Sequence, residues 1–138
     1  CELPGIMAES LGSVPAECLM GRTDYLLLYG SETEIINMKP DFRTLAGTGA
    51  RGVIVTAPGD TVDFVSRCFF PQIGIDEDPV TGSAHTTLTP FWSARLGKKT
   101  MTARQLSARG GVLECTLDGD RVRIAGTAML YLKGEIYI

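Results

Sequence analysis

The sequence lacks the pattern of cysteines and histidines that a metal centre needs. Its four cysteines, Cys1, Cys18, Cys68 and Cys115, form no CxxC pair, and the single histidine is His85. Because structural zinc sites take four such ligands at short, regular spacings, we expect no metal to bind. Cys18, Cys68 and Cys115 lie in apolar stretches, where a free cysteine behaves as a small core residue.

Excess positive charge and long apolar runs are also missing. The net charge is −3 and the isoelectric point is near 5.1, whereas nucleic-acid-binding domains usually carry a basic surface. The longest apolar runs, YLLLY at 25–29 and GVIV at 52–55, are far too short to cross a bilayer, and no signal peptide is visible. We therefore expect a cytoplasmic protein with neither nucleic acid nor membrane as a partner. A local group of basic residues is interpreted as a solvated surface: Arg95, Lys98, Lys99, Arg104 and Arg109.

The first half of the chain is predicted to alternate short helices with strands. A length of 138 residues with 44% hydrophobic residues fits one domain with a substantial core. Helices are predicted at 7–11, from Ser31, where Glu34 completes a capping box, and at 41–46. Strands are predicted on both sides of the turn GRTD at 21–24, and in the stretches RGVIVTAPGD and TVDFVSRCFF.

One main helix is predicted from Gly82 to Leu96, closed by Gly97 as its C′ residue. Pro90 lies inside it and should kink it or loosen one turn. Its threonines are poor helix formers, so tertiary packing must hold the segment. The expected apolar stripe contains Ala84, Leu88, Phe91 and Leu96, widened by Trp92.

The remainder of the chain is predicted to be rich in strands. In LECTLDGDRVRIAG, Leu113, Cys115 and Leu117 should point inward, and Asp118-Gly119 predicts a type I′ hairpin. The stretches MTARQLSARGG and AMLYLKGEIYI each predict a further strand. The whole pattern indicates an α+β domain, with a mixed or antiparallel sheet curled around the main helix.

The stretch EDPVTGSAH at 77–85 has two interpretations. In the first, Asp78-Pro79 forms an ordinary N-cap and N1 pair, or Thr81 or Ser83 caps a helix that begins later. Such capping needs no function, and a lone histidine such as His85 is more often structural than catalytic.

In the second interpretation the same residues form a site. Gly82 and Ser83 at a helix N-terminus present free N–H groups to an anion, and glycine admits close approach. The stretch lacks the lysine and glycine spacing of a phosphate-binding loop, so a carboxylate is the expected guest. Glu77 and Asp78 beside that anion are candidates for acid–base work, because repulsion raises a carboxyl pKa. His85 faces either the cleft or the core.

These residues carry a resemblance to a known family. VDFVSRCFFPQIGIDEDPVTGSAHTTLTPFW, with RGVIVTAPGD before it and RQLSARGG after it, resembles the second half of the phenazine-biosynthesis PhzF-like family. The resemblance runs from about the DYLLLY stretch to the C-terminus. It implies the diaminopimelate epimerase-like fold, in which two similar lobes each wrap a sheet around a central helix, with the active site between them.

The resemblance also implies a chemistry. Family members of this kind isomerise a small carboxylated substrate by proton transfer without a cofactor, as the phenazine enzyme does with a dihydro-hydroxyanthranilate. By motif match, Asp78 corresponds to the active-site aspartate, and Gly82 and Ser83 to the backbone donors that hold the substrate carboxylate. Thr81 stands where related epimerases carry a catalytic cysteine, so a two-thiol racemase mechanism is not expected. Thr81 and His85 are further candidates for substrate binding.

The chain departs from the family pattern in length. The family's principal acid–base glutamate belongs to a first lobe, and nothing here resembles that lobe. Because the first residue is Cys1 rather than Met, we interpret residues 1–138 as one C-terminal lobe, left by processing or truncation. We expect a homodimer or a complementary N-terminal lobe as its partner. Two alternatives are a binding or assembly module without turnover, and a hydrolase or lyase that uses Glu77, Asp78 and His85 together.

Overall fold

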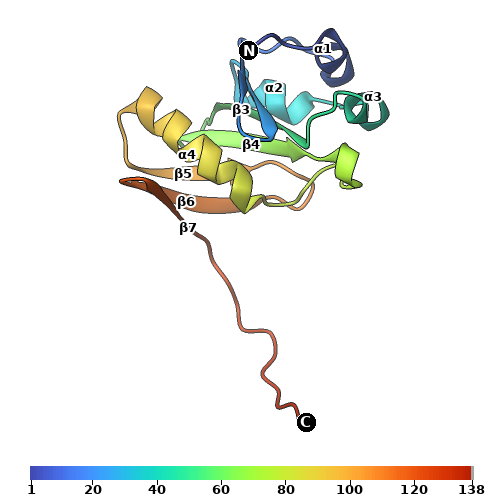
Figure 1. The fold of residues 1–138 in the computed structure, drawn as a ribbon. Helices are drawn as coiled ribbons and strands as arrows, with labels where there is room; N and C mark the ends of the chain where they lie inside the picture. Colours follow the sequence, from blue (N-terminus) through green and yellow to red (C-terminus); the bar gives the residue numbers. More distant parts are fainter. Residues whose placement is uncertain (138) are drawn as a thin grey trace.

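The computed structural model describes residues 1–137, in which seven strands form one mixed sheet in the order of the chain (Figure 1). Strand pairs are antiparallel except β2–β3 and β4–β5, which are parallel. The strands are β1 (Glu17–Met20), β2 (Asp24–Leu28), β3 (Gly52–Pro58), β4 (Phe64–Phe69), β5 (Thr100–Gln105), β6 (Gly111–Asp118) and β7 (Arg121–Ala125). The helices are α1 (Gly5–Leu11), α2 (Glu32–Asn37), α3 (Phe42–Ala46), the 3₁₀ turn η1 (Pro71–Ile73) and α4 (Gly82–Leu96).

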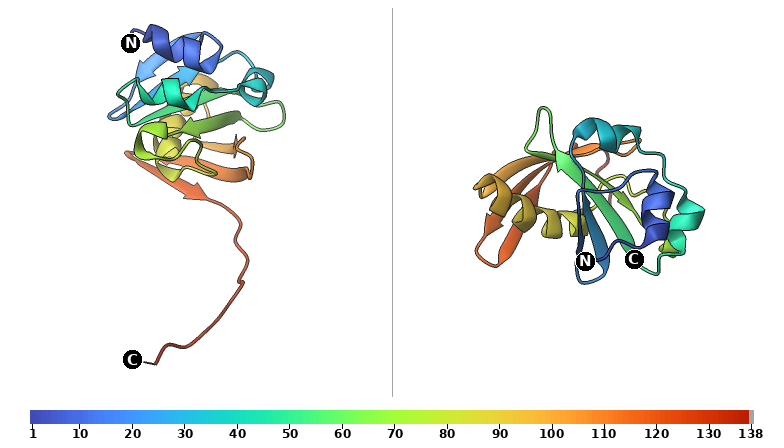
Figure 2. Two further views of the ribbon diagram at one scale, coloured as in Figure 1. Left: turned by 90° about the vertical axis from the view of Figure 1, so that its right-hand side faces the viewer. Right: turned by 90° about the horizontal axis from the view of Figure 1, so that it is seen from above.

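The two parallel connections place helices on opposite faces of the sheet. The β2–β3 connection carries α2 and α3, which join α1 on one face, whereas the β4–β5 connection carries α4 on the other (Figures 1 and 2). Successive side chains of a strand point to opposite faces, so Ile54 of β3 packs toward α4 while Val53 and Val55 pack toward the three short helices. The central strands are therefore buried on both faces.

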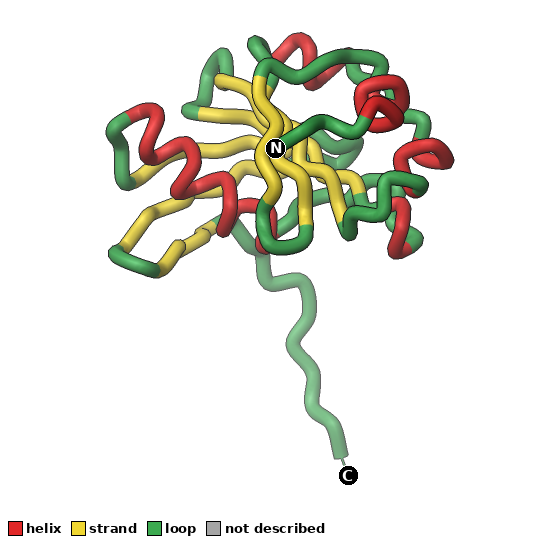
Figure 3. The backbone as a smooth tube through the Cα atoms, turned by 45° about the horizontal axis from the view of Figure 1, so that its top comes forward, coloured by secondary structure: helices red, strands yellow, loops and turns green. Residues whose placement is uncertain are grey.

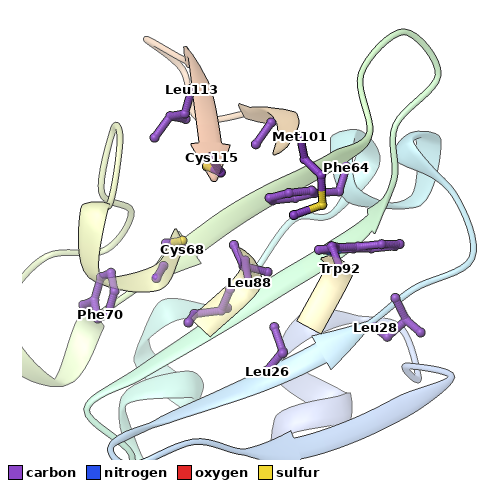
Figure 4. Packing of buried hydrophobic residues seen from close by; sticks show 13 residues of the cluster. Leu26, Leu28, Phe64, Cys68, Phe70, Leu88, Trp92, Met101, Leu113 and Cys115 are labelled. Atoms are coloured by element: carbon purple, nitrogen blue, oxygen red, sulfur yellow. The ribbon is translucent and has the colours of Figure 1, made fainter. Parts of the chain in front are cut away.

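Helix α4 lies in the curve of the sheet, as predicted. Ala84, Leu88 and Trp92, spaced four residues apart, join the core cluster that also contains Phe64 and Met101 (Figure 4). The Trp92 ring stacks on Phe64 with centroids 5.7 Å apart. The buried face is rotated from the expected stripe, because Leu96 at the last turn is 39% exposed.

The two ends of α4 follow the sequence signals closely. Gly97 adopts a left-handed conformation with φ 66° and its N–H donates to the Ser93 carbonyl at 3.0 Å, as a C-terminal glycine should. The helix continues through Pro90, which lies on the exposed side. The carbonyl four residues earlier belongs to exposed Thr86, where water can replace the missing N–H donor.

Most other predicted elements are present, with one difference in turn type. Ser31 caps α2 by accepting from the Glu34 N–H, and Asp41 caps α3. The hairpin after β6 pairs Asp118 with Arg121, so its two central residues are Gly119 and Asp120. Among the described residues only glycines have positive φ, with Gly119 at 60°. A type I′ turn needs positive φ at both central residues, so the prediction of that type was wrong and the turn has the pattern of type II′.

The strand predicted in AMLYLKGEIYI is not formed. After β7, residues 126–137 belong to no strand and extend away from the rest of the fold (Figures 1 and 3); Ile138 lies outside the described residues. The physical reason is that a strand needs a neighbour for its backbone hydrogen bonds, and no described residue offers this segment one. We call residues 127–137 the C-terminal segment.

Candidate functional site

The loop before α4 is fixed by hydrogen bonds to β4, to β5 and to the residue Ser107 after β5, and by packing against β6. The Asp78 N–H donates to the Cys68 carbonyl on β4 at 3.0 Å, and the Asp78 carbonyl accepts from Gln105 Nε2 on β5 at 2.7 Å. Ser107 Oγ, just after β5, donates to the Pro79 carbonyl at 2.7 Å. Gly111 at the start of β6 leaves room for Val80, since a Cβ there would come 2.5 Å from Val80 Cγ2. The motif is therefore held at a defined place.

Gln105 is a residue of the candidate site that sequence reasoning missed. It is fully buried, and its Oε1 accepts from the Thr81 N–H at 2.8 Å while its Nε2 donates to Thr81 Oγ at 3.2 Å. One side-chain amide thus fixes both ends of the 78–81 turn. The only available signal was a polar residue at an inward position of a strand whose burial alternates.

Asp78 is not a helix cap, which corrects one of the two interpretations. Helix α4 begins at Gly82, and its N-cap residue is Thr81, whose side chain makes no capping bond. Instead Thr81 Oγ donates to Asp78 Oδ2 at 2.5 Å. The first N–H groups of a helix have no partner within the helix. Those of Gly82 and Ser83 are therefore available to a ligand, at an end where the helix dipole favours an anion.

Gly82 leaves space in front of this helix end. Gly82 and Ser83 are exposed, and a Cβ on Gly82 would meet nothing within 4 Å. Its φ is not positive, so the backbone here does not require glycine. The absent side chain leaves the N–H groups of Gly82 and Ser83 open to approach.

A shallow pocket of about 170 Å³ adjoins these groups. It is lined by Arg51, Phe70, Ile73, Ile75, Asp78, Thr81 and Ser83. This volume is large enough for several waters, and so for part of a small molecule, since one water occupies about 30 Å³ in the liquid. The wall opposite the helix is mostly apolar, as is usual for pockets that bind small molecules.

Arg51 supplies a positive charge at the edge of the pocket. Its Nε donates to Asp24 Oδ1 at 2.9 Å, and its guanidinium lies 5.3 Å from the centre of the Phe70 ring. The Phe70 ring in turn packs directly over Gly52, where a Cβ would come within 2.3 Å of it. Because Arg51 and Phe70 are held by β2 and β3, this wall is preorganised.

Glu77 does not face the pocket as a free carboxylate. It forms a two-pronged ion pair with Arg67 of β4, with Nε to Oε1 at 2.7 Å and Nη2 to Oε2 at 3.0 Å. Arg67 Nη1 also donates to the carbonyls of Ile35 and Met38 at the end of α2. Glu77 therefore ties the motif loop to the opposite layer, and the alternative in which it performs hydrolysis with its neighbours is not supported.

His85 points into the core rather than toward the pocket. It is fully buried beside Phe64, and its Nδ1 lies 2.8 Å from the Thr81 carbonyl. Because a carbonyl only accepts, Nδ1 carries the proton, and Nε2 has no hydrogen-bond partner. Burial lowers the pKa of His85, which keeps the ring neutral. Contact between His85 and a substrate is therefore not supported; the ring holds the first turn of α4 instead.

The cysteine thiols supply no reactive group to the site. Cys68 and Cys115 are fully buried, and burial raises the pKa of the Cys68 thiol to about 12. A thiol with so high a pKa is a poor nucleophile. Within residues 1–137 no group of three acidic, histidine or cysteine side chains could hold a metal ion. In the same residues no helix is long and apolar enough to cross a membrane.

The site can thus hold an anion at the N-terminus of α4 and present one oriented carboxyl group, Asp78, to whatever is bound there. This arrangement, within a mixed sheet curled around a central helix, defines a lobe of the diaminopimelate epimerase-like fold. Solved structures share this fold: a PhzF-family protein of Enterococcus faecalis superposes with a TM-score of 0.91 at 45% identity. A phenazine biosynthesis PhzC/PhzF protein of Clostridium difficile superposes with a TM-score of 0.88 at 46% identity.

The sequence matches the family of phenazine biosynthesis-like proteins (PhzC-PhzF) over residues 3–134, and the chain belongs to that family. It is 48% identical over 138 residues to one uncharacterized isomerase of Pseudomonas aeruginosa and 53% identical over 131 residues to another. The alignments cover 100% and 94% of this chain but only 53% and 50% of those proteins. The superposition on the E. faecalis protein likewise includes 100% of this chain but only 53% of that protein. It therefore spans about half the length of its relatives.

Proposed function

We propose that this chain supplies the carboxylate-binding half of the active site of an isomerase that moves a proton on a small carboxylated substrate without a cofactor. The substrate carboxylate binds the N–H groups of Gly82 and Ser83, and its body rests on Phe70 and the neighbouring isoleucines. Asp78 then lies beside the substrate and takes or gives the proton. Membership of the family and the isomerase names of the P. aeruginosa relatives support this class of reaction.

The observation that carries the proposal is the hydrogen bond from Thr81 to Asp78. It engages one carboxylate oxygen of Asp78, and in the described structure no side chain caps the N–H groups of Gly82 and Ser83. A carboxyl group that only capped the helix would instead accept those N–H groups directly. An uncapped helix end beside an oriented carboxylate is the arrangement that ligand binding needs.

Isomerisation by proton transfer needs a base that takes a proton from one atom of the substrate and an acid that returns it at another, and two residues can share this work. Of the three side chains considered for this work, only Asp78 lines the pocket; Glu77 is engaged by Arg67 and His85 is buried. The second acid–base group therefore comes from the complementary lobe that the relatives' greater length implies. Together with that lobe the chain forms a cleft around the pocket.

The test replaces Asp78 in the protein assembled with the complementary half of the P. aeruginosa relative. Small carboxylates, among them a dihydro-hydroxyanthranilate, are incubated in D₂O, and NMR detects deuterium that enters a carbon–hydrogen bond. We expect Asp78→Asn to abolish this exchange while the melting temperature stays nearly unchanged. Asp76→Asn, at an exposed acid two residues away, is the matched control and should exchange normally. Full exchange by Asp78→Asn at matched folding would contradict the proposal.

A second candidate is a small-molecule-binding or assembly module that kept the fold and lost turnover. The observation in its favour is that Asp78 is the sole carboxyl group lining the pocket in residues 1–137. In that case added carboxylates would shift the NMR signals of the Gly82 and Ser83 amides. The carboxylates themselves would take up no deuterium, even when both halves of the protein are present.

A further inference from the structure

Arg51 lines the pocket beside α4, and the proposed function gives its side chain no task. Its Nε donates to Asp24 Oδ1 at 2.9 Å, and its Nη2 donates to Asp24 Oδ2 at 2.5 Å. The backbone N–H of Arg51 donates to the Thr23 carbonyl at 3.2 Å, and the guanidinium lies 5.3 Å from the centre of the Phe70 ring. The protein itself therefore holds both the main chain and the side chain of Arg51 in place.

Part of this guanidinium is free to bind a ligand. A guanidinium carries five N–H groups, and the pair with Asp24 uses the one on Nε and one of the two on Nη2. Within residues 1–137 the Nη1 of Arg51 donates to no acceptor, and the side chain is 40% exposed. Because the two-pronged pair fixes the plane of the group, the N–H groups of Nη1 are a preoriented hydrogen-bond donor.

The pocket thus has two sets of donors on separate elements. The N–H groups of Gly82 and Ser83 begin α4, whereas Arg51 stands just before β3. The exposed side chains of Ile73 and Ile75 line the same pocket and offer no polar group to a ligand. A small acid held only by its carboxylate can still rotate about that end. A second hydrogen bond, made to Arg51, would fix which atom of the acid faces the carboxyl group of the site.

The charges around Arg51 decide which kind of group it binds. Its positive charge is already balanced by Asp24, and Asp78 brings a further carboxyl group to the same pocket. A second carboxylate on the substrate would add unbalanced negative charge there, which is unfavourable. A carbonyl or hydroxyl oxygen accepts the same N–H groups and adds no charge.

We propose that Arg51 binds an uncharged oxygen of the substrate and thereby selects small acids that carry one carboxylate together with a carbonyl or hydroxyl group. The carboxylate binds at the start of α4, and the uncharged oxygen accepts from Nη1 of Arg51. Asp24 and Phe70 act on specificity through Arg51, because they hold its guanidinium. The proposal rests on the carboxylate site of the proposed function but not on proton transfer by Asp78.

The test compares acids built on one ring. Benzoate has a single carboxylate, the three hydroxybenzoates add an uncharged oxygen, and the three benzenedicarboxylates add a second charge. Each is titrated against the chain and against the protein assembled with the complementary half, and binding is followed by the NMR shift of the Ser83 amide. We expect one hydroxybenzoate to bind about tenfold more tightly than benzoate and than any dicarboxylate, as one hydrogen bond to a charged group allows. Arg51→Met still packs on Phe70 but has no N–H to donate, so it should bind that hydroxybenzoate no better than benzoate.

Asp24→Asn tests the charge argument in a second variant, which decides the matter even if Arg51→Met folds poorly. Asparagine keeps an oxygen for Arg51 but removes the balancing charge, so the dicarboxylates should gain several-fold relative to the hydroxybenzoates. Arg95→Met is the matched control. Arg95 also lies over an aromatic ring, 4.4 Å from the centre of Phe91, and pairs with Glu17, but it lines no part of this pocket. Its replacement should leave the preference among the acids unchanged.

The same preference for a hydroxybenzoate in the wild type and in Arg51→Met would overturn the proposal. A wild-type preference for a dicarboxylate would overturn it too, as would an Asp24→Asn protein in which the order of the acids is unchanged. Binding of benzoate with no preference among the acids would count against Arg51 alone and leave the carboxylate site standing. If none of the acids shifts the Ser83 amide, the carboxylate site of the proposed function fails, and the role of Arg51 fails with it.

Discussion

Thr81 Oγ donates its proton to Asp78 Oδ2 at 2.5 Å and at the same time accepts a hydrogen bond from Gln105 Nε2 at 3.2 Å. The donors in these two bonds follow from chemistry. The amide nitrogen of Gln105 only donates, so the Thr81 hydroxyl accepts from it and gives its single proton to Asp78. Asp78 is therefore oriented by a chain of bonds that begins in the buried core. In the described structure its Oδ1 makes no hydrogen bond to the protein, which leaves that oxygen for a ligand.

Removing the Thr81 hydroxyl tests this orientation. Thr81→Val keeps the shape of the side chain but releases Asp78 Oδ2, so we expect turnover by the complete two-lobe protein to fall about tenfold or more with little change in KM. Thr81→Ser restores the hydroxyl and should recover most of the activity. Equal losses in Thr81→Val and Thr81→Ser would show that the methyl group, rather than the hydrogen bond, matters.

Gly82→Ala separates access to the helix end from stability of the helix. The backbone at Gly82 accepts any residue, and an added Cβ meets nothing in the protein. We therefore expect an unchanged or slightly higher melting temperature, because alanine favours helix more than glycine. Carboxylate binding, measured by calorimetry or by NMR shifts of the Ser83 amide, should weaken several-fold. Undiminished binding would show that the ligand does not approach over Gly82.

The ion pair between Arg67 and Glu77 should contribute to stability. Both side chains are mostly buried, with exposed fractions of 12% and 19%, and Arg67 also binds two backbone carbonyls. Glu77→Gln leaves a buried guanidinium without its charge partner, which costs about 3 kcal/mol in such pairs. Denaturant unfolding should show this loss, whereas Glu17→Gln, which breaks the exposed pair with Arg95, should cost less than about 1 kcal/mol. Similar costs for the two variants would contradict the structural role of Glu77.

The main helix and its place in the sheet could be predicted because local signals and packing agree there. Gly97 marks the end of α4 by its left-handed conformation, and Ala84 and Leu88 mark its buried face. The same kind of signal failed for AMLYLKGEIYI. Its composition favours a strand, but a strand forms only beside a partner, and composition does not say where that partner is.

The site was predictable only in part for a related reason. Asp78, Thr81 and Ser83 are close in sequence and meet at one pocket, so the motif was visible as a unit. Arg51, just before β3, and Gln105 of β5 reach the same place, and contacts between distant segments leave no trace in a single sequence. The direction of the His85 side chain was ambiguous, because a shift of one residue in the start of the helix turns a side chain from the cleft to the core.

The cysteines should differ sharply in reactivity. Cys1 is exposed, whereas Cys68 and Cys115 are buried, and burial raises the pKa of both thiols. Mass spectrometry after brief treatment of the native protein with iodoacetamide at pH 8 should show modification at Cys1 and none at Cys68 or Cys115. Because no thiol belongs to the site, the modified protein should keep its carboxylate binding. Loss of binding on modification of Cys1 alone would contradict the site assignment.

The single histidine gives the protein a defined pH dependence of stability. Burial lowers the pKa of His85 below its ordinary value of 6.5, so the folded state takes up this proton less readily than the unfolded chain does. Between the lowered pKa and 6.5 the unfolded state binds more protons, and stability therefore rises with pH there. The stability that comes from keeping His85 neutral is fully present above pH 6.5 and is lost as the pH falls. The slope of the free energy of unfolding against pH approaches about 1.4 kcal/mol per pH unit.

Urea unfolding between pH 7 and pH 5 measures this slope. We expect the free energy of unfolding to decrease toward pH 5 in the wild-type chain. His85→Asn keeps a side-chain N–H that can donate to the Thr81 carbonyl but removes the titrating ring, so its stability should be lower at pH 7 and nearly constant across the window. The carboxyl groups of Asp41 and Asp63 have lowered pKa values and act at more acidic pH, outside this range. An identical slope in the wild type and in His85→Asn would show that the buried histidine is not the group responsible.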